Sequence, residues 1–318
     1  MSVGVSVIVA VHDGGAHLRT ALDSVLASSW RDLELIVVDD GSTDDSLAVA
    51  RSYDDPRVLP IVLERNVGVA AAREVGVAHS AGEYVWFVDA DDAVPSTGLE
   101  AMITAARQSG ADVVVGESVV VGGASRTSPP ASAHWTGPEA LRSLLLGRIR
   151  GQLWDKLIAG DLLRSLEIPH SRVHSDVALV ARCLAASGVV VRVDDLVYSY
   201  TVRADSIIGR SRRRAESLRS VEQVVTAAAA ATAPVPYDAI AYYRARFIGL
   251  SMIRDSAGGG WSQDESAGLQ QEGRDRIAWA AIRLALTGSE WRVAATLAVA
   301  RLRPGLFLTG RRWARVSR

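Results

Sequence analysis

The chain has 318 residues, of which 48% are hydrophobic and 22% charged, as expected for one large or two small globular domains and not for a disordered chain. Its 35 basic and 36 acidic residues leave a formal net charge of −1. This balance favours neither a nucleic-acid-binding protein nor an acidic solvating one. The single cysteine, Cys183, excludes an internal disulfide framework and a cysteine-rich zinc site.

Neither a targeting segment nor a membrane span is expected. The N-terminal apolar run is short and no basic segment precedes it. No stretch reaches the roughly 18 uncharged apolar residues that a spanning helix needs. The sequence therefore predicts a cytoplasmic protein.

Between residue 5 and about 120, short apolar runs alternate with longer segments of helical period. Leu18, Leu22 and Val25, for example, recur three and four residues apart between the first two runs. This alternation predicts an α/β fold with a mainly parallel central sheet flanked by helices. The five expected strands are Val5–Ala10, Leu33–Val38, Val58–Val62, Tyr84–Val88 and Asp112–Val115.

The second half of the chain is expected to be mostly helical. Residues 121–133 are rich in Gly, Ser and Pro and predict a linker. Beyond it, residues 138–166 and 175–187 have helical patterns, and residues 189–203 predict a strand pair or one strand with an extended tail. From about residue 211 the chain is Ala- and Arg-rich, which favours helices.

Carboxylates follow three of the expected strands. Asp13 comes after the first strand, Asp40 after the second, and Asp89, Asp91 and Asp92 after the fourth. The carboxyl ends of parallel strands meet at one edge of a sheet, where ligands bind in such folds. Because like charges repel and unpaired carboxylates are costly to desolvate, this concentration predicts a divalent cation.

Five segments carry a resemblance to a known family: SVIVAVHDGG, ELIVVDDGSTDDS, GEYVWFVDADD, LWDKL and HSDVALVARC. In order and spacing, and over about residues 3–208, they resemble the inverting family 2 glycosyltransferases with a GT-A fold. The resemblance implies a GT-A catalytic domain at residues 1–208, with a nucleotide-sugar half at about 1–120 and an acceptor half at about 134–208. Residues 209–318 would then be a helical C-terminal region with a basic tail.

The resemblance also implies an activity. It is the metal-dependent, inverting transfer of a hexose or N-acetylhexosamine from a nucleotide-diphosphate sugar to a hydroxyl group. The acceptor would be a glycan, a cell-wall polymer, a lipid-linked sugar or a small molecule, which places the protein in polysaccharide biosynthesis. UDP is favoured as the nucleotide by its frequency in the family, although thymine presents the same N–H edge as uracil.

The cation implied by the resemblance is Mg²⁺ or Mn²⁺, which neutralises the donor's diphosphate as a Lewis acid. Asp91 matches the family's metal-ligating carboxylate, and Asp89 matches the carboxylate that lies against the donor and the metal's waters. Ala90 lies between them. Asp92 has two readings that the sequence leaves open, since it either orients this group or caps the following turn.

The remaining donor-binding residues also follow from the resemblance. Asp40 matches the residue that accepts a hydrogen bond from N3 of uracil, and the backbone of Val9, Ala10 and Val11 would flank the base. Gly68 and Arg73 complete the expected donor site. Arg73 either pairs with the strand-end carboxylates or supports them, and Glu74 stands where the family usually has Asn.

Inversion needs a general base that takes the acceptor hydroxyl's proton. Asp176 matches the family's base, although Ser175 replaces the Glu that usually precedes it. Lys156 is the one lysine among the 35 basic residues, so a compact ammonium is expected to have a catalytic role there. Arg203 matches a basic residue that reaches the diphosphate. Trp154 is either a sugar-stacking platform or part of the core.

The basic tail at residues 291–318 contains seven arginines, Trp291 and Trp313, and no acidic residue. Such a segment favours peripheral contact with the anionic inner face of a membrane. Packing on the catalytic domain or on a partner subunit is the alternative. Binding to nucleic acid is not expected. For the whole protein, the alternative to an enzyme is a catalytically impaired nucleotide-sugar-binding module, as the departures at Glu74 and Ser175 suggest.

Overall fold

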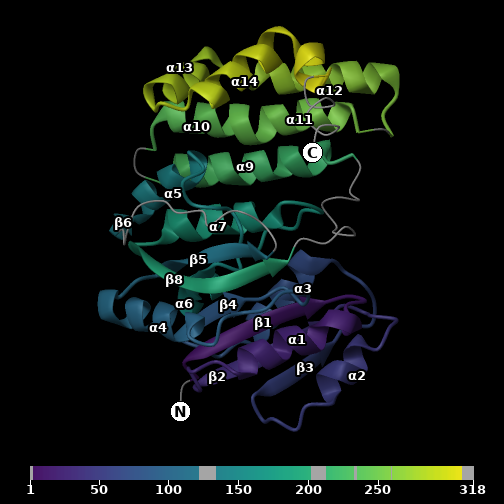
Figure 1. Ribbon diagram of the computed structural model, residues 1–318, viewed down its shortest axis with the longest axis vertical. Coiled ribbons are helices and arrows are strands. Elements are labelled where there is room, and N and C mark those ends of the chain that lie inside the picture. The colour runs from purple at the N-terminus through teal and green to yellow at the C-terminus, as the bar shows by residue number, and fades with distance from the viewer. Residues whose placement is uncertain (1–2, 122–133, 202–212, 233–234, 259, 310–318) are drawn as a thin grey trace. The chain divides into compact units, whose positions relative to one another are not determined.

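The computed structural model describes residues 3–121, 134–201, 213–232, 235–258 and 260–309 (Figure 1). The predicted linker lies outside these ranges, apart from Val121. The chain divides into two compact units. Unit 1 comprises residues 1–137, 151–170 and 182–204, and unit 2 comprises residues 138–150, 171–181 and 205–318.

The described part of unit 1 contains one eight-stranded sheet with the strand order β3-β2-β1-β4-β7-β5-β8-β6. β1 pairs in parallel with β2 and β4, β2 with β3, and β5 with β8. β7 is antiparallel to both β4 and β5, and β6 is antiparallel to β8. The strands are β1 Val5–Val11, β2 Leu33–Asp39, β3 Val58–Val62, β4 Tyr84–Phe87, β5 Val113–Val121, β6 His134–Thr136, β7 Lys156–Ala159 and β8 Val189–Thr201.

Helices cover both faces of this sheet (Figure 1). Alternate residues of β1, such as Val7 and Val9, share a buried cluster with residues of α1 (Gly15–Leu26), α2 (Ser46–Arg51) and α4 (Gly98–Ser109). The other face is covered by α3 (Val69–His79), where Gly76 lies so close to Ile8 that a Cβ atom at position 76 would be 2.5 Å from Ile8 Cγ2. The short helix α6 (Gly160–Arg164) follows β7. Burial on both faces explains the near-continuous apolar strands.

The described part of unit 2 is helical. In α9, Leu218, Val221 and Val225 are buried at helical spacing. α10, η1 and α11 follow one another without a break. The backbone of η1 lies close to that of α12, since a Cβ atom at Gly249 would be 2.6 Å from the carbonyl oxygen of Gly273. The bounds are α5 Gly137–Leu145, α7 Ser175–Ala186, α9 Ala215–Ala231, α10 Tyr237–Tyr243, the π-helix η1 Arg244–Gly249, α11 Leu250–Ser256, α12 Gln263–Asp275, α13 Trp279–Thr287 and α14 Trp291–Leu302. Both α5 and α7 have residues in each unit.

The expected α/β fold, with its mainly parallel sheet and helical C-terminal region, is confirmed. The five expected strands are present, and β5 continues to Val121. Residues 189–201 form one long strand, not a hairpin. The helix expected over residues 138–166 is confirmed at α5 and at α6, and it is wrong between them, where residues 156–159 form β7 between β4 and β5. Strand pairing on both sides overrides the local helical pattern there.

The domain boundary expected near residue 208 remains a prediction. Unit 2 takes in residues 138–150 and 171–181 as well as the later helices. In the described part of the chain no helix is both long and apolar enough to cross a bilayer.

Candidate active site

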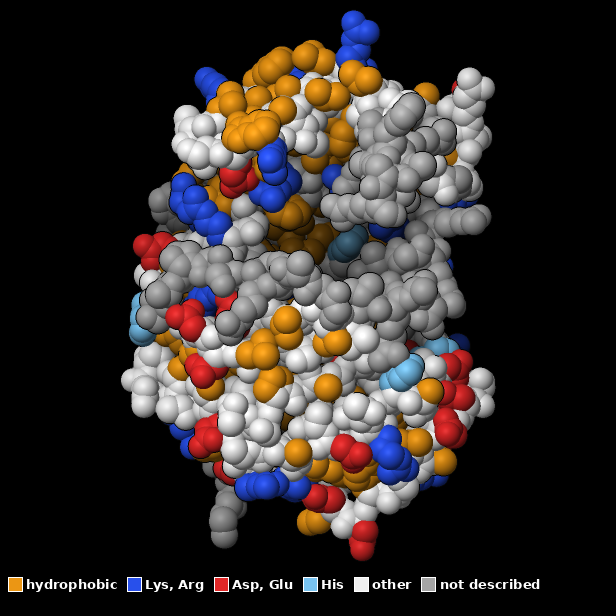
Figure 2. Space-filling model, in the orientation of Figure 1, with side chains coloured by type: hydrophobic (Ala, Val, Ile, Leu, Met, Phe, Trp, Pro, Cys, Tyr) orange, Lys and Arg blue, Asp and Glu red, His pale blue; other side chains and the backbone are white. Residues whose placement is uncertain are grey.

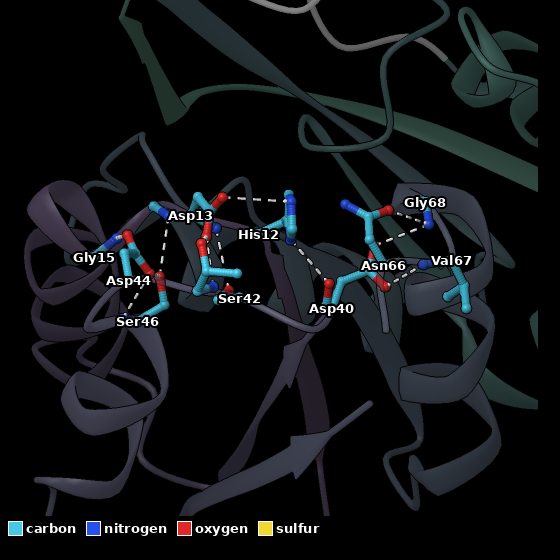
Figure 3. A network of polar contacts seen from close by, with 12 residues as sticks. His12, Asp13, Gly15, Asp40, Ser42, Asp44, Ser46, Asn66, Val67 and Gly68 are labelled. Carbon is cyan, nitrogen blue, oxygen red and sulfur yellow. Dashed lines mark hydrogen bonds and ion pairs between the residues drawn. The ribbon is translucent and has the colours of Figure 1, made fainter. Parts of the chain in front are cut away.

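The carboxyl ends of β1 and β2 are held together by backbone and loop contacts (Figure 3). The backbone N–H of Asp40 donates to the carbonyl oxygen of Val11 at 2.8 Å. Nδ1 of His12 lies 2.9 Å from the carbonyl oxygen of Asp40. The predicted base-flanking strand end, Val9–Val11, is therefore fixed beside Asp40, as the parallel register requires.

The loops beyond these strand ends form a network of polar contacts (Figure 3). Asp13 has a φ of 51°, and its Oδ1 accepts from the backbone N–H of Thr43 at 2.7 Å. That hydrogen bond is the main cause that lowers the pKa of Asp13. Asp44 accepts from the backbone N–H groups of Gly15 and Ser46. These carboxylates thus tie the first two strand-end loops together.

Asp40 itself is buried, and each of its carboxylate oxygens accepts a backbone hydrogen bond (Figure 3). Val67 N–H donates to Oδ1 at 2.7 Å and Gly68 N–H donates to Oδ2 at 2.9 Å. Gly68 has a φ of 92°, which favours glycine at that position. A carboxylate has about four acceptor positions, so these two bonds leave capacity for an N–H from a nucleobase. The expected donor residues Asp40 and Gly68 are in direct contact.

A second contact joins two expected donor-site residues. Nη2 of Arg73, on α3, lies 2.9 Å from Oδ1 of Asp89, just beyond β4. Only 8% of the Arg73 side chain is exposed, against 32% for Asp89. The Arg73 guanidinium also lies over the ring of Phe87. Of the two roles considered for Arg73, the structure shows direct pairing with a strand-end carboxylate. This ion pair fixes the orientation of the Asp89 carboxylate.

Asp92 is buried and bonded to β8. Its Oδ2 accepts from the hydroxyl of Tyr198 at 2.9 Å, and its Oδ1 accepts from the backbone N–H of Thr201 at 2.8 Å. The Tyr198 oxygen in turn accepts from the backbone N–H of Asp89 at 3.1 Å. Asp92 N–H donates to Asp89 O, which closes the acidic turn at residues 89–92. Asp92 therefore joins this turn to the end of β8.

Negative charge is concentrated in the acidic turn. Burial raises the pKa of Asp92 to about 7, and the charges of Asp89 and Asp91 add to this effect. The hydrogen bonds from Thr201 and Tyr198 oppose it. The pKa of the Tyr198 hydroxyl is also raised, first by burial and then by Asp89 and Asp92. An added cation is favoured where neighbouring anions raise the pKa of a carboxyl group in this way.

The acidic turn fits a magnesium or manganese ion that shares its coordination with the donor. Asp89 and Asp91 are both half-exposed beyond the end of β4. The described residues contain no group of three or more His, Cys, Asp or Glu side chains that could hold a metal. Mg²⁺ commonly binds through one or two carboxylates, with substrate phosphates and water completing the shell. A pair of carboxylates is thus enough when a diphosphate is bound.

Trp154 and Lys156 both lie in the core of unit 1. Trp154 stacks on Tyr198 with ring centroids 4.4 Å apart, and it is 6% exposed, so the core role is the one observed. Lys156 is 1% exposed, and its ammonium donates to Asp155 Oδ1 and to the carbonyl oxygen of Gln152. This ion pair favours a structural role for Lys156 at the start of β7. Its catalytic role remains a prediction.

The expected base, Asp176, lies in the first turn of α7, in unit 2. It is half-buried, and the hydroxyl of Ser175 is 3.5 Å from its Oδ1. His174 precedes them with a φ of 64°. Burial lowers the pKa of His174, and the charge of Arg214 lowers it further. Arg203 lies outside the described residues.

Sequence reasoning did not identify Tyr198 as part of this site. Tyr198 and Tyr200 alternate along β8, and both rings stack on Trp154. The alternation alone indicates that the two rings share one face of a strand. It does not show that Asp92, more than 100 residues earlier, is the partner of Tyr198.

Comparisons with known proteins agree with this geometry. Residues 6–163 match the family model described as "Glycosyl transferase family 2". The chain is 30% identical over 219 residues to the cholesterol galactosyltransferase of Borreliella burgdorferi, with 64% of this chain and 61% of that protein covered. It is 27% identical over 225 residues to glycosyltransferase GlyG of Streptococcus pneumoniae, with 65% and 74% covered. The chain thus spans about three fifths and three quarters of these two relatives.

Solved structures show the same fold. TarS 1-349 of S. aureus, in complex with UDP-GlcNAc, has a TM-score of 0.70 at 17% identity, with 96% of this chain and 89% of that chain covered. The mannosyltransferase PcManGT of Pyrobaculum calidifontis, in complex with GDP-Man and Mn²⁺, has a TM-score of 0.57 at 18% identity, with 96% and 84% covered.

The matched residues 6–163 include β1, β2, β4 and the strand-end residues Asp40, Asp89 and Asp91. The family match, the named relatives and the shared fold therefore agree, and this chain belongs to glycosyl transferase family 2, with a GT-A fold.

Proposed function

We propose that this chain is a metal-dependent, inverting glycosyltransferase that moves a hexosyl or N-acetylhexosaminyl group from a nucleotide-diphosphate sugar to an acceptor hydroxyl. The observation that carries the proposal is the edge of the unit 1 sheet. There, Asp40 follows β2, and its carboxylate is held by two backbone hydrogen bonds. Asp89 and Asp91 follow β4 and are half-exposed. Ligands bind at this edge of open α/β sheets.

In this proposal, Asp40 accepts the N–H of the nucleobase with the acceptor positions that Val67 and Gly68 do not use. The backbone of Val9–Val11 and the loop at Gly68 border the base. UDP is the favoured nucleotide by its frequency in the family, since thymine offers the same N–H as uracil to an acceptor-only carboxylate. The UDP-GlcNAc bound by TarS is consistent with this choice, whereas GDP-Man in PcManGT keeps GDP as an alternative.

A bound Mg²⁺ or Mn²⁺ would neutralise the diphosphate of the leaving nucleotide as a Lewis acid. Asp91 would be a direct ligand, and Asp89 would lie against the donor and the waters of the ion. Arg73 holds Asp89 by its 2.9 Å ion pair, so this carboxylate keeps one orientation. Ala90 connects Asp89 and Asp91 in the acidic turn. Mn²⁺ in the PcManGT complex supports a divalent ion without choosing between the two metals.

Asp176 would take the proton of the acceptor hydroxyl while that oxygen attacks the anomeric carbon from the side opposite the leaving nucleotide. Asp176 lies in the first turn of α7. Arg203 would stabilise the departing diphosphate, and Lys156 would act through the core ion pair with Asp155. A glycan or a lipid-linked sugar is the proposed acceptor.

The proposed location of the enzyme is the inner face of a membrane, where it would reach a lipid-linked acceptor. The tail at residues 291–318, with seven arginines and no acidic residue, supports peripheral contact with anionic lipid.

The test is calorimetric binding of UDP, GDP, dTDP and CDP, first with Mn²⁺ and then with EDTA, followed by hydrolysis assays with the sugars of the preferred nucleotide. We expect metal-dependent binding of UDP and slow hydrolysis of one UDP-sugar. Failure to bind any of the four nucleotides would overturn the roles given to Asp40 and Asp91. Asp91→Ala should remove the metal dependence.

The alternative is a nucleotide-sugar-binding module without turnover. Its support is the pair of departures at Ser175 and Glu74, of which Glu74 lies 2.9 Å from His170 in an exposed ion pair. Tight, metal-dependent binding with neither hydrolysis nor transfer to any acceptor would favour this alternative.

A further inference from the structure

The last two named helices of unit 2 present large apolar side chains to solvent. On α13, Trp279 is 52% and Leu286 is 57% exposed, and on α14, Trp291 is 63% and Leu302 is 58% exposed. Leu306, a few residues after α14, is 62% exposed. We refer to the exposed side of residues 279–309 as the α13–α14 surface. An apolar concentration of this kind marks an interaction site more often than chance exposure.

The exposed apolar residues of α14 form one stripe. Trp291, Ala295, Val299 and Leu302 are all exposed and are spaced by four, four and three residues, so they lie on one face of the helix. Another face of α14 is buried through Ala294, Leu297 and Ala300.

α14 is thus apolar on two faces, of which packing inside unit 2 covers one. The exposed apolar face is therefore expected to be covered in the working state of the protein.

α13 also presents exposed apolar side chains on this surface. Trp279, Arg283 and Leu286 are exposed with a spacing of four and three, whereas Ile282 and Ala285 are buried. Figure 2 shows the hydrophobic side chains gathered over α13 and α14, with basic side chains beside them. Phe307 is buried and lies under the guanidinium of Arg254, which holds the end of the surface on unit 2.

The charge of this surface has one sign. Its exposed charged side chains are Arg283, Arg292 and Arg303. The acidic residue within 279–309 is Glu290, which is neutralised by an ion pair with Arg246 at 3.0 Å. The sequence then continues to residue 318 with four more arginines, Trp313 and no acidic residue.

We propose that the α13–α14 surface docks on an anionic lipid bilayer, with both helices lying in the plane of the interface. The tryptophan and leucine side chains would enter the boundary between headgroups and acyl chains, and the arginines would pair with lipid phosphates. The inference deepens the proposed function and rests on it only for the choice of acceptor. It names the face by which the transferase would reach a lipid-linked sugar.

A second copy of the chain fits this surface less well. In a symmetric dimer the same patch meets itself, which would bring the arginines of one patch, Arg283, Arg292 and Arg303, against the arginines of the other. Like charges in a contact of that kind are costly. An anionic bilayer instead supplies apolar depth and opposite charge together, so it complements both properties of the surface.

The experiment is cosedimentation of the full chain with vesicles of phosphatidylcholine alone and of phosphatidylcholine mixed with phosphatidylserine, at low and at high salt. We expect binding to the mixed vesicles, weakened by salt, and little binding to the neutral ones. Arg292→Gln with Arg303→Gln should weaken binding about 25-fold, since each arginine near an anionic surface contributes about fivefold. Trp291→Ser with Leu302→Ser should weaken it by a similar factor.

The matched controls remove the same groups elsewhere. Arg51→Gln with Arg148→Gln removes two exposed arginines, and Tyr237→Ser removes an aromatic side chain that is 69% exposed. Both should bind vesicles like the unchanged chain. Since the charge variant keeps every apolar contact, it remains informative if the apolar variant does not fold.

The proposal is overturned if the unchanged chain does not bind mixed vesicles, or if surface and control variants lose binding equally. A dimer in sedimentation equilibrium that only the α13–α14 variants convert to monomer, without vesicle binding, would assign the surface to a second copy. No donor is present in this assay, so a negative result leaves the proposed sugar transfer standing, and nucleotide calorimetry tests that separately.

Discussion

Asp92 differs from its acidic neighbours in burial, because it is 3% exposed whereas Asp89 and Asp91 are half-exposed. Its carboxylate also receives two hydrogen bonds from β8. These bonds favour the ionised form and burial disfavours it, and burial prevails, since the pKa rises from 3.8 to about 7. A buried acid of this kind makes the stability of the protein depend on pH.

The sign of that dependence follows from proton binding. Between pH 4 and pH 7 the folded state holds a proton on Asp92 that the unfolded state has lost, so this contribution to stability declines as pH rises. Relative to Asp92→Asn, we expect the unchanged chain to lose about 2–3 kcal/mol of unfolding free energy between pH 5 and pH 8. Urea unfolding in EDTA at the two pH values measures this difference.

The control for this prediction is Asp54→Asn, at an exposed position. It should follow the pH dependence of the unchanged chain. If Asp92→Asn also follows it, Asp92 does not carry a raised pKa.

Asp176 permits a test that separates chemistry from binding. Asp176→Asn keeps the size of the side chain and removes the base, so transfer should fall by about 10²-fold or more. Metal-dependent nucleotide binding should be nearly unchanged, because Asp176 is not among the proposed donor-binding residues. Transfer is measured by nucleotide release, and affinity by calorimetry. Loss of affinity together with transfer would make Asp176 a structural residue.

At this scale, sequence predicts residue positions better than residue partners. The places of Asp40, Asp89 and Asp91 follow from parallel strands ending at one edge. The bonds from Gly68 to Asp40 and from Arg73 to Asp89 depend on how α3 packs, which local patterns do not encode. Lys156 shows a different limit, since its rarity in the sequence predicted that a compact ammonium matters there, whereas its burial and its partners depend on tertiary packing.

At the scale of elements, α3 lies unusually close to the sheet. Helix propensity alone predicts that replacing an internal helical glycine with alanine stabilises by about 1 kcal/mol. At position 76, however, the new Cβ would be 2.5 Å from Cγ2 of Ile8, a residue that is 1% exposed. Overpacking of this kind costs about 1–3 kcal/mol. We therefore expect Gly76→Ala to be neutral or destabilising by up to about 2 kcal/mol in chemical unfolding.

Gly268 supplies the matched control. It lies inside α12, and a Cβ there would meet nothing within 4 Å. Gly268→Ala should raise the unfolding free energy by a few tenths to about 1 kcal/mol. Equal stabilisation by both substitutions would show that α3 can move away from β1 at little cost.

The elements also show where local pattern is a sufficient guide. β1, β2 and β4 are recognisable because each is an apolar run that is buried almost throughout. β7 is only four residues long, lies within a stretch of helical period, and is antiparallel to both neighbours. Its pairing is non-local, so the pattern of residues 138–166 predicted one helix in its place.

At the scale of the whole molecule, the chain passes between the two compact units several times. Residues 138–150 and 171–181 belong to unit 2, although unit 1 residues lie on both sides of each in the sequence. The first of these segments has contacts inside unit 2, since a Cβ at Gly147 would lie 2.8 Å from the ring of Phe247. Its apolar residues, such as Leu141 and Leu144, are fully buried.

This organisation bears on the boundary that sequence resemblance implies near residue 208. A protein ending at residue 208 would keep residues 138–150 and 171–181 but lose the rest of unit 2, so their buried leucines would face water. We expect residues 1–208 alone to unfold at lower urea concentration than the full chain, and to bind a hydrophobic dye that the full chain does not. The contrary result is that residues 1–208 unfold cooperatively at the same urea concentration and bind nucleotide as tightly as the full chain. In that case the catalytic domain ends where the resemblance places it, and the later helices are an independent addition.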